Sequence, residues 1–118
     1  MYGLSKDEDL SFLIGRELQQ VCVGNFQVIL NFDNQTSINI ECEFSVRGTA
    51  EHGPCEENRN INISKLFGVL GHRVVGLTNK GDGDLEIKFS DGSLIAILDA
   101  DANIESYTIS DPNHMIII

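Results

Sequence analysis

The chain contains no tryptophan, and aromatic residues make up only 7% of it. A platform that stacks sugars or nucleic-acid bases needs several aromatic side chains, so this scarcity argues against one. Basic residues are also few, since 8 Lys and Arg stand against 18 Asp and Glu, for a formal net charge of -10. No run of Lys or Arg offers a phosphate backbone a footprint, so we expect no nucleic-acid partner. The acidic balance suits a basic protein partner or simply solubility.

Long apolar runs are absent too. The longest, residues 94–98, is far shorter than the roughly 20 residues that a membrane helix needs, so we expect no membrane partner. The first nine residues are acidic where a secretory signal is basic, and no apolar segment of signal length follows them. Three cysteines cannot all pair within one chain. We therefore expect reduced thiols and a cytoplasmic protein.

Motifs for catalysis or nucleotide binding are lacking as well. No Gly-x-Ser-x-Gly, Gly-x-Gly-x-x-Gly or Walker pattern occurs, and these are the arrangements that expose a nucleophile or cradle phosphates. Cys55 beside a histidine is the best nucleophile that can be assembled, and it has no visible orienting group. Asp82 and Asp84 could form an acid pair, but they lie in a Gly-Asp-Gly-Asp stretch typical of a hairpin turn. An enzyme is disfavoured, although distant residues could still converge.

Metal-binding patterns are incomplete. Residues 99–103 begin like a calcium loop, but Ile104 and Ser110 stand where that loop needs Gly and Glu. His52 and Cys55 form a single loose pair, whereas a structural zinc site needs four ligands. We therefore expect no metal and no cofactor.

Two copies of one pattern dominate what is present. Short apolar stretches at 10–14 and 66–70 end in Gly15 and Gly71, which predicts two short helices, capped at Asp9 and Ser64. Each is followed by period-two alternation that ends in a phenylalanine, at positions 32 and 89, and such alternation is typical of half-buried strands. The phenylalanines are one position further apart than the glycines. A single insertion near 81–84 therefore reconciles the two copies.

The turns predict the strand register. A three-residue loop at 90–92 places Ile87 opposite Ile95 on one face and puts Gly92 where a bulged turn needs a positive φ. The equivalent loop at 33–35 places Leu30 opposite Ile38. A register shifted by one residue would exchange the buried and exposed faces, so the choice is testable.

The strand that begins at Ile38 is predicted to continue to Val46, with Glu41, Glu43 and Ser45 facing water. Its counterpart at 94–98 is apolar on both faces. That pattern indicates either a central strand in a covered sheet, which we favour, or a contact with a second subunit. Residues 104–109 and 115–118 are predicted to form further strands, the last one paired or covered because it would be sticky as a free edge.

These patterns predict a mainly β (β-rich α+β) fold. Two related antiparallel hairpin or meander units, each preceded by a short helix, would pack as a small sandwich or partly open barrel. The 118 residues suit a single domain, with an internal duplication at about 9–46 and 64–109 and a polar loop at 47–60 between the copies.

Three stretches, LGHRV at 70–74, GDLEIKFSDGS at 83–93 and IESYTI at 104–109, carry a resemblance to a known family. They resemble small bacterial β-rich proteins catalogued only as a domain of unknown function, whose pattern joins a Leu-Gly-x-x-Val start, a Gly-x-Leu-x-Ile-x-Phe-x-Asp-Gly hairpin and a Glu-x-Trp end. Tyr107 stands where that family usually has tryptophan. These motif residues form turns and core, so the resemblance implies a fold and no activity.

Three functions compete. The first is a non-catalytic protein-binding module for a basic protein, with an immunity-like protein as one form of it, because the chain is small and acidic. The second is a structural homodimer or larger homo-oligomer without a ligand. The third is an enzyme or small-ligand binder with a pocket between the halves. For the first, the candidate partner-binding residues are Glu41, Glu43, Asp99, Asp101 and Glu105.

Overall fold

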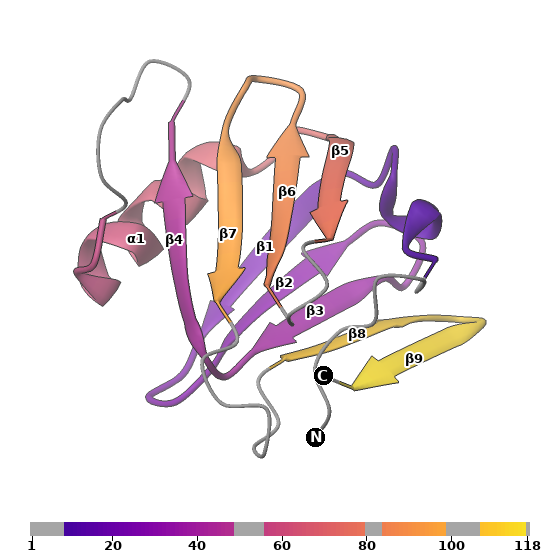
Figure 1. The fold of residues 1–118 in the computed structure, drawn as a ribbon, viewed down its shortest axis with the longest axis horizontal. Helices are drawn as coiled ribbons and strands as arrows, with labels where there is room; N and C mark the ends of the chain where they lie inside the picture. Colours follow the sequence, from indigo (N-terminus) through magenta and orange to yellow (C-terminus); the bar gives the residue numbers. More distant parts are fainter. Residues whose placement is uncertain (1–8, 49–55, 80–83, 99–106, 118) are drawn as a thin grey trace.

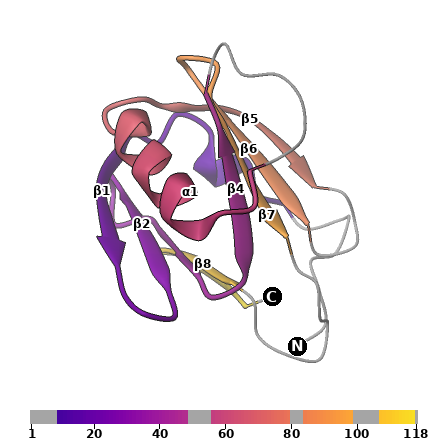
Figure 2. The same cartoon turned by 90° about the vertical axis from the view of Figure 1, so that its left-hand side faces the viewer.

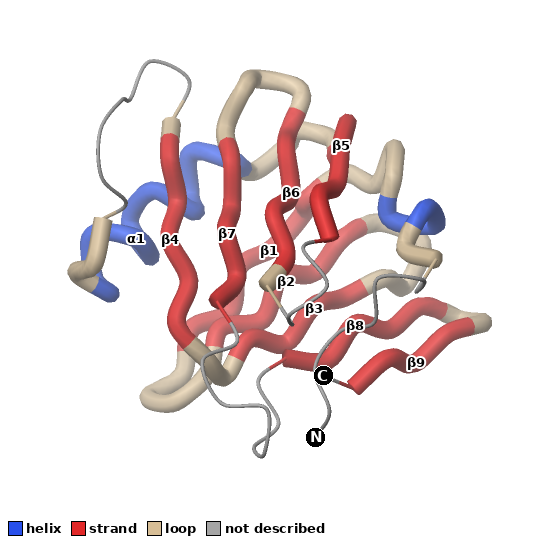
Figure 3. The backbone as a smooth tube through the Cα atoms, viewed as in Figure 1, coloured by secondary structure: helices blue, strands red, loops and turns tan. Residues whose placement is uncertain are grey.

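The computed structural model describes residues 9–48, 56–79, 84–98 and 107–117. Within them the chain is mainly β, as predicted, with two antiparallel sheets and no closed barrel (Figures 1 and 3). One sheet has the strand order β1-β2-β3-β8-β9 and the other has the order β4-β7-β6-β5. The strands are β1 (Leu18–Val23), β2 (Val28–Phe32), β3 (Ser37–Ile40), β4 (Glu43–Arg47), β5 (Val74–Asn79), β6 (Leu85–Phe89), β7 (Leu94–Leu98), β8 (Tyr107–Asp111) and β9 (His114–Ile117).

Both hairpins have the predicted register. Leu30 pairs with Ile38 in the first, and Ile87 pairs with Ile95 in the second. Gly92 has a φ of 91° in the second loop, a conformation that L side chains avoid. The three-residue loops are therefore confirmed, and the apolar faces of the strands point where the alternation placed them.

The core lies between the two sheets. Phe32 and Phe89, at matching places in the two hairpins, are 5% and 0% exposed. Their rings stack with centroids 6.4 Å apart and planes 8° apart, a favourable offset arrangement for aromatic pairs. Ile38 and Ile95 are also fully buried, so the two hairpins contribute to one shared interior.

A short antiparallel joint links the sheets where β1 and β5 begin. The Gly15 N–H donates to the Val74 carbonyl at 2.8 Å, and the Gly71 N–H donates to the Leu18 carbonyl at 2.8 Å. Moving one copy of the pattern onto the other exchanges these two bonds, so the joint has local pseudo-two-fold symmetry. Both glycines have positive φ, 87° and 85°, as predicted for residues that end short helical turns. The origin of the two units by duplication stays a prediction.

The sequence patterns gave no bounds for β1 and β5, although Cys22, which lies in β1, falls in a strand pattern. Each strand carries an irregularity in its pairing, between Leu18 and Gln20 in β1 and between Val74 and Gly76 in β5. A bulge inserts a residue into one strand and shifts the alternation of its side chains. Period-two patterning is therefore broken in both strands, at equivalent positions of the two copies.

The prediction of one continuous strand from Ile38 to Val46 is wrong. β3 ends at Ile40 and β4 begins at Glu43 in the other sheet. Ser45, predicted to face water, is only 7% exposed. It pairs with Ala96, which is equally buried. Both side chains are small, and on the same face each is flanked by longer side chains two residues away along its strand.

Strand β7 lies between β4 and β6, so the central placement predicted for residues 94–98 is confirmed. The last predicted strand is also paired, since β9 joins β8 along its length. Residues 104–106 of the predicted strand 104–109 lie outside the described part.

Helix α1 (Arg59–Leu66) corrects the predicted polar loop and the predicted cap. The loop was placed at 47–60, yet Arg47 ends β4 and the helix begins at Arg59. The side chain of Asn58, and not that of Ser64, accepts hydrogen bonds from the first turn. Asn58 is a strong N-cap residue, but the polar helix after it shows little apolar periodicity, which hid its start.

Figure 2 shows α1 between the β1-β2 hairpin and β4. The helix is tied to both sides. Asn62 bonds to β4, and Arg59 Nη2 donates to the Gly24 carbonyl of the β1-β2 turn at 2.9 Å. A second helical segment, the 3-10 turn η2 (Phe67–Val69), follows it, and η1 (Ser11–Leu13) precedes β1.

Candidate protein-binding surface

Two of the five predicted partner-binding residues fall in the described part. Glu41 and Glu43 are both exposed, on either side of the passage from β3 to β4. Asp99, Asp101 and Glu105 lie outside the described residues. The prediction that they bind a partner is untested for all five.

The strand pairing places Leu98 and Tyr107, the described residues that flank the acidic sequence 99–106, beside these two glutamates. Leu98, the residue before the segment, pairs with Glu43. Tyr107, the residue after it, pairs with Ile40, the neighbour of Glu41. Leu98 and Tyr107 therefore both lie at the same end of the molecule as Glu41 and Glu43.

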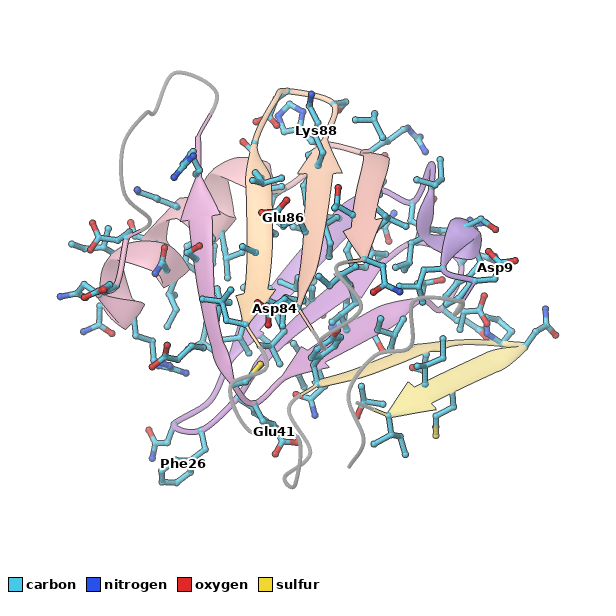
Figure 4. All side chains as sticks on the ribbon, in the orientation of Figure 1. Asp9, Phe26, Glu41, Asp84, Glu86 and Lys88 are labelled. Atoms are coloured by element: carbon cyan, nitrogen blue, oxygen red, sulfur yellow. The ribbon has the colours of Figure 1, made fainter. Side chains whose placement is uncertain are left out.

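Two further residues at this end were missed by sequence reasoning. Asp84 precedes Leu85, which pairs with Ile97, so it flanks Leu98 on the side opposite Glu43. Phe26 is 87% exposed in the β1-β2 turn, two residues before Val28, the partner of Ile40. Figure 4 shows Phe26 and Glu41 at the lower end of the molecule, with Asp84 above them. We call Phe26, Glu41, Glu43 and Asp84 the acidic end.

An exposed phenylalanine beside carboxylates is an arrangement that protein interfaces use. Aromatic side chains bury large areas on binding and concentrate binding energy. The turn that carries Phe26 is held by the Gly24 N–H, which donates to the Gln27 carbonyl at 2.8 Å, and by the Arg59 bond to Gly24. The ring is thus presented on an ordered support. Only the tertiary pairing shows that Phe26 lies beside Glu41. The one signal in the sequence is a phenylalanine within a polar Gly-Asn-Phe-Gln turn, where an aromatic residue is unusual.

A second cluster joins Ser90, His72 and Asp91 at the β6-β7 turn. His72 Nδ1 lies 3.5 Å from Ser90 Oγ, and Nε2 lies 3.7 Å from Asp91 Oδ2. The same carboxylate accepts from the Ser93 N–H at 2.9 Å and the Ser93 hydroxyl at 2.8 Å. Ser90 Oγ accepts the Arg73 N–H at 3.1 Å. These bonds hold the turn against the β5 start, so the cluster fits a structural lock better than an activated nucleophile.

The cluster of Ser90, His72 and Asp91 makes the stability of the protein depend on pH. Burial raises the pKa of Asp91, but hydrogen bonds from Ser93 and the charge of His72 outweigh it, and the pKa lies below the ordinary value of 3.8. A lowered pKa adds stability above the unfolded-state pKa, and this contribution is lost as pH falls through the lower folded-state value. Asp91→Asn is therefore expected to cost about 1 kcal/mol at neutral pH and progressively less below about pH 4.

Urea unfolding of both proteins across the acid range measures this difference. Glu57→Gln is the matched control, because it removes one exposed carboxylate without touching the turn. A cost of Asp91→Asn that stayed constant down to strongly acidic pH would show that the charge plays no part.

Potential metal ligands do not gather in the described part. Among the residues that the structure describes, no group of three or more His, Cys, Asp and Glu side chains could hold an ion. His52 and Cys55, the loose pair of the sequence, lie outside those residues. In the described ranges, no helix is long and apolar enough to cross a membrane.

A family model described as a family of unknown function, DUF6188, matches residues 10–118. The chain belongs to this family. The resemblance drawn from its motifs is thus confirmed at the level of a β-rich family without assigned function. No curated protein matches the chain, and no solved structure does either. In this member of DUF6188 the motif residues are structural, since Gly71 and Gly92 have positive φ and Tyr107 is 1% exposed.

Proposed function

We propose that this member of DUF6188 is a non-catalytic protein-binding module that engages a basic protein through its acidic end. One observation carries the proposal: Leu98 and Tyr107, the described residues on either side of the acidic sequence 99–106, pair with Glu43 and Ile40, at the end of the molecule that carries Glu41 and the exposed Phe26. A concentrated negative surface attracts a basic partner and speeds encounter, while the aromatic ring supplies apolar contact area.

The action would resemble that of an immunity protein, which neutralises a toxin by covering it. The net charge of -10 supports such a role. A toxin that acts on an anionic substrate has a basic binding surface, and an acidic protein is electrostatically complementary to that surface. The proposal places the chain in the cytoplasm, where its cysteines would stay reduced.

The test is capture of partners on immobilised protein at low salt, followed by identification of the bound proteins and titration of the strongest. Glu43→Lys is expected to weaken binding of a basic partner about fivefold, since a rim charge is worth roughly 1 kcal/mol. Phe26→Ala is expected to weaken it as much or more.

Glu57→Lys is the matched control, because it makes the same charge reversal at an exposed position before α1. Binding by the wild type should weaken steeply as salt is raised. Equal losses for Glu43→Lys and Glu57→Lys would show that net charge alone matters, and capture of no basic protein would end the proposal.

A further inference from the structure

The outer face of the five-stranded sheet has an unusual composition. Alternate side chains of a strand point to opposite faces, and those of one set lie in the core. The pairing lines up the other set in two rows that cross all five strands. One row is Cys22, Ile29, Asn39, Thr108 and Ile117, and the other is Gln20, Asn31, Ser37, Ser110 and Met115. We call these ten residues the neutral face.

None of the ten is charged, although 22% of the whole chain is and none of them is buried. The other sheet differs at the corresponding hairpin positions. There β6 carries Glu86 and Lys88 toward solvent (Figure 4), where β2 carries Ile29 and Asn31. Depletion of charge, with Met and other apolar residues present, distinguishes the centre of protein interfaces from ordinary surface.

Hydrogen bonds between strands order the neutral face. Asn31 Nδ2 donates to Gln20 Oε1 at 3.0 Å, and Ser37 Oγ and Ser110 Oγ lie 3.1 Å apart. The side chains are therefore held in place before any partner arrives, which lowers the entropy cost of binding. Asn39, on the central strand β3, has an Oδ1 without a hydrogen-bond partner among the described residues. A small turn of its amide would offer this acceptor to a facing donor.

The most exposed apolar residues of the face lie at its β9 edge. Met115 is 71% exposed and Ile117 is 40% exposed. Exposed apolar side chains supply the contact area that an interaction site buries. The mixture of amides, hydroxyls and two exposed apolar residues can pair with itself, because it contains both donors and acceptors.

We propose that the neutral face docks a second copy of this chain. Two copies with a net charge of -10 each repel one another. The neutral face itself carries no carboxylate, and Glu41, whose Oε1 accepts from Asn39 Nδ2 at 3.4 Å, lies at its border, so contact through this face limits the repulsion. A basic partner gains no Coulomb attraction here, so the face suits a different occupant from the acidic end. A two-fold contact uses the same patch on both copies, which a self-complementary set of neutral groups satisfies.

The area sets the strength of this contact. Five strands at about 4.8 Å spacing and four residues at about 3.3 Å rise cover roughly 300–400 Å² on each copy. The total for two copies is smaller than the area that specific, stable interfaces usually bury, so the dimer lies at the weak end. We expect a dissociation constant on the order of 100 μM.

Salt separates this dimer from the proposed binding of a basic partner. Screening reduces the mutual repulsion of two acidic copies, so sedimentation equilibrium should show more dimer at about 0.5 M salt than at low salt. Binding at the acidic end should change in the opposite sense. The experiments can therefore overturn the dimer proposal without affecting the partner-binding proposal, and they can overturn the partner-binding proposal without affecting the dimer proposal.

Thr108→Lys is the decisive variant, because it places a charge near the middle of the neutral face. Thr78→Lys makes the same change on β5, on the outer face of the other sheet. Both variants lower the net negative charge equally, so net repulsion is matched. Thr108→Lys is expected to lower the dimer affinity at least tenfold, and Thr78→Lys is expected to leave it unchanged or slightly raised.

Met115→Glu provides a second variant at a largely exposed position, where folding is not at risk, and it should also disrupt the dimer. Circular dichroism confirms that each variant is folded. A wild-type monomer at about 500 μM in high salt would overturn the proposal. A dimer that both Thr108→Lys and Met115→Glu leave intact would place the contact elsewhere and would overturn the proposal equally.

Discussion

Phe89→Ala is expected to destabilise the protein by about 3–5 kcal/mol, the range for truncating a fully buried phenylalanine. The side chain is 0% exposed and stacks on Phe32 at the centre of the shared core. Its removal leaves a cavity between two hairpins that cannot collapse, because each is fixed by its own register. Chemical denaturation with the midpoint and slope recorded separately measures the loss.

Phe26→Ala is the matched control, because it makes the same truncation at a side chain that is 87% exposed. Its effect on the free energy of unfolding should stay within about 0.5 kcal/mol. Comparable losses at the two positions would contradict the placement of Phe89 in the core.

A double-mutant cycle of Phe32→Leu and Phe89→Leu tests whether the two hairpins share one interior. Aromatic stacking contributes about 0.5–1.5 kcal/mol beyond area burial. The two substitutions should therefore show a coupling energy of that size. Strict additivity would mean that the rings are energetically independent, whatever their distance.

The hairpins could be predicted from sequence because every signal that defines them is local. Alternation, a three-residue turn and Gly92 lie within one short stretch of chain, and they agree on one register. The break after Ile40 is different, because the alternation continues through it while the chain passes to another sheet. No local pattern marks a change of sheet when the side-chain period is preserved.

For the candidate surfaces too, local patterns predicted some residues, and only the tertiary pairing placed the others. Exposure of Glu41 and Glu43 was predicted from alternation alone. Phe26 and Asp84 join them only through pairs such as Val28–Ile40 and Leu85–Ile97. The neutral face depends on the pairing of Ser37 with Ser110, which lie far apart in the sequence, so it has no signature in any single segment.

Asn62 is the polar residue whose loss should be most damaging. It is 1% exposed on α1, and its amide bonds to the outer edge of β4 as a neighbouring strand would. Oδ1 accepts the Val46 N–H at 2.8 Å, and Nδ2 donates to the Phe44 carbonyl at 3.2 Å. Nδ2 also donates to the Glu56 carbonyl at 2.8 Å, which ties the approach to the helix to the same edge.

Asn62→Ala is expected to cost about 2–4 kcal/mol, because backbone groups of β4 lose their partners where water has little access. Asn60→Ala, on an exposed position of the same helix, is the control. It should be neutral or slightly stabilising, since alanine is the better helix former. Thermal and urea unfolding of the two variants measure the difference.

Asn62→Asp separates the two halves of the amide's role. It keeps an acceptor for the Val46 N–H but loses the donor to Phe44 and buries a charge, so its carboxyl should have a raised pKa. A group with a raised pKa that is buried neutral loses stability as pH rises through the unfolded-state value. The variant should therefore approach the wild type in acid and fall away from it at neutral pH.

The edge that Asn62 covers gives the substitution a second consequence. An uncovered edge strand offers its N–H and C=O groups to other chains, and natural proteins block such edges. We therefore expect Asn62→Ala to aggregate on heating where Phe89→Ala of similar stability unfolds without it, as followed by light scattering. Equal scattering from the two variants at matched fractions unfolded would show that the amide stabilises β4 without protecting it.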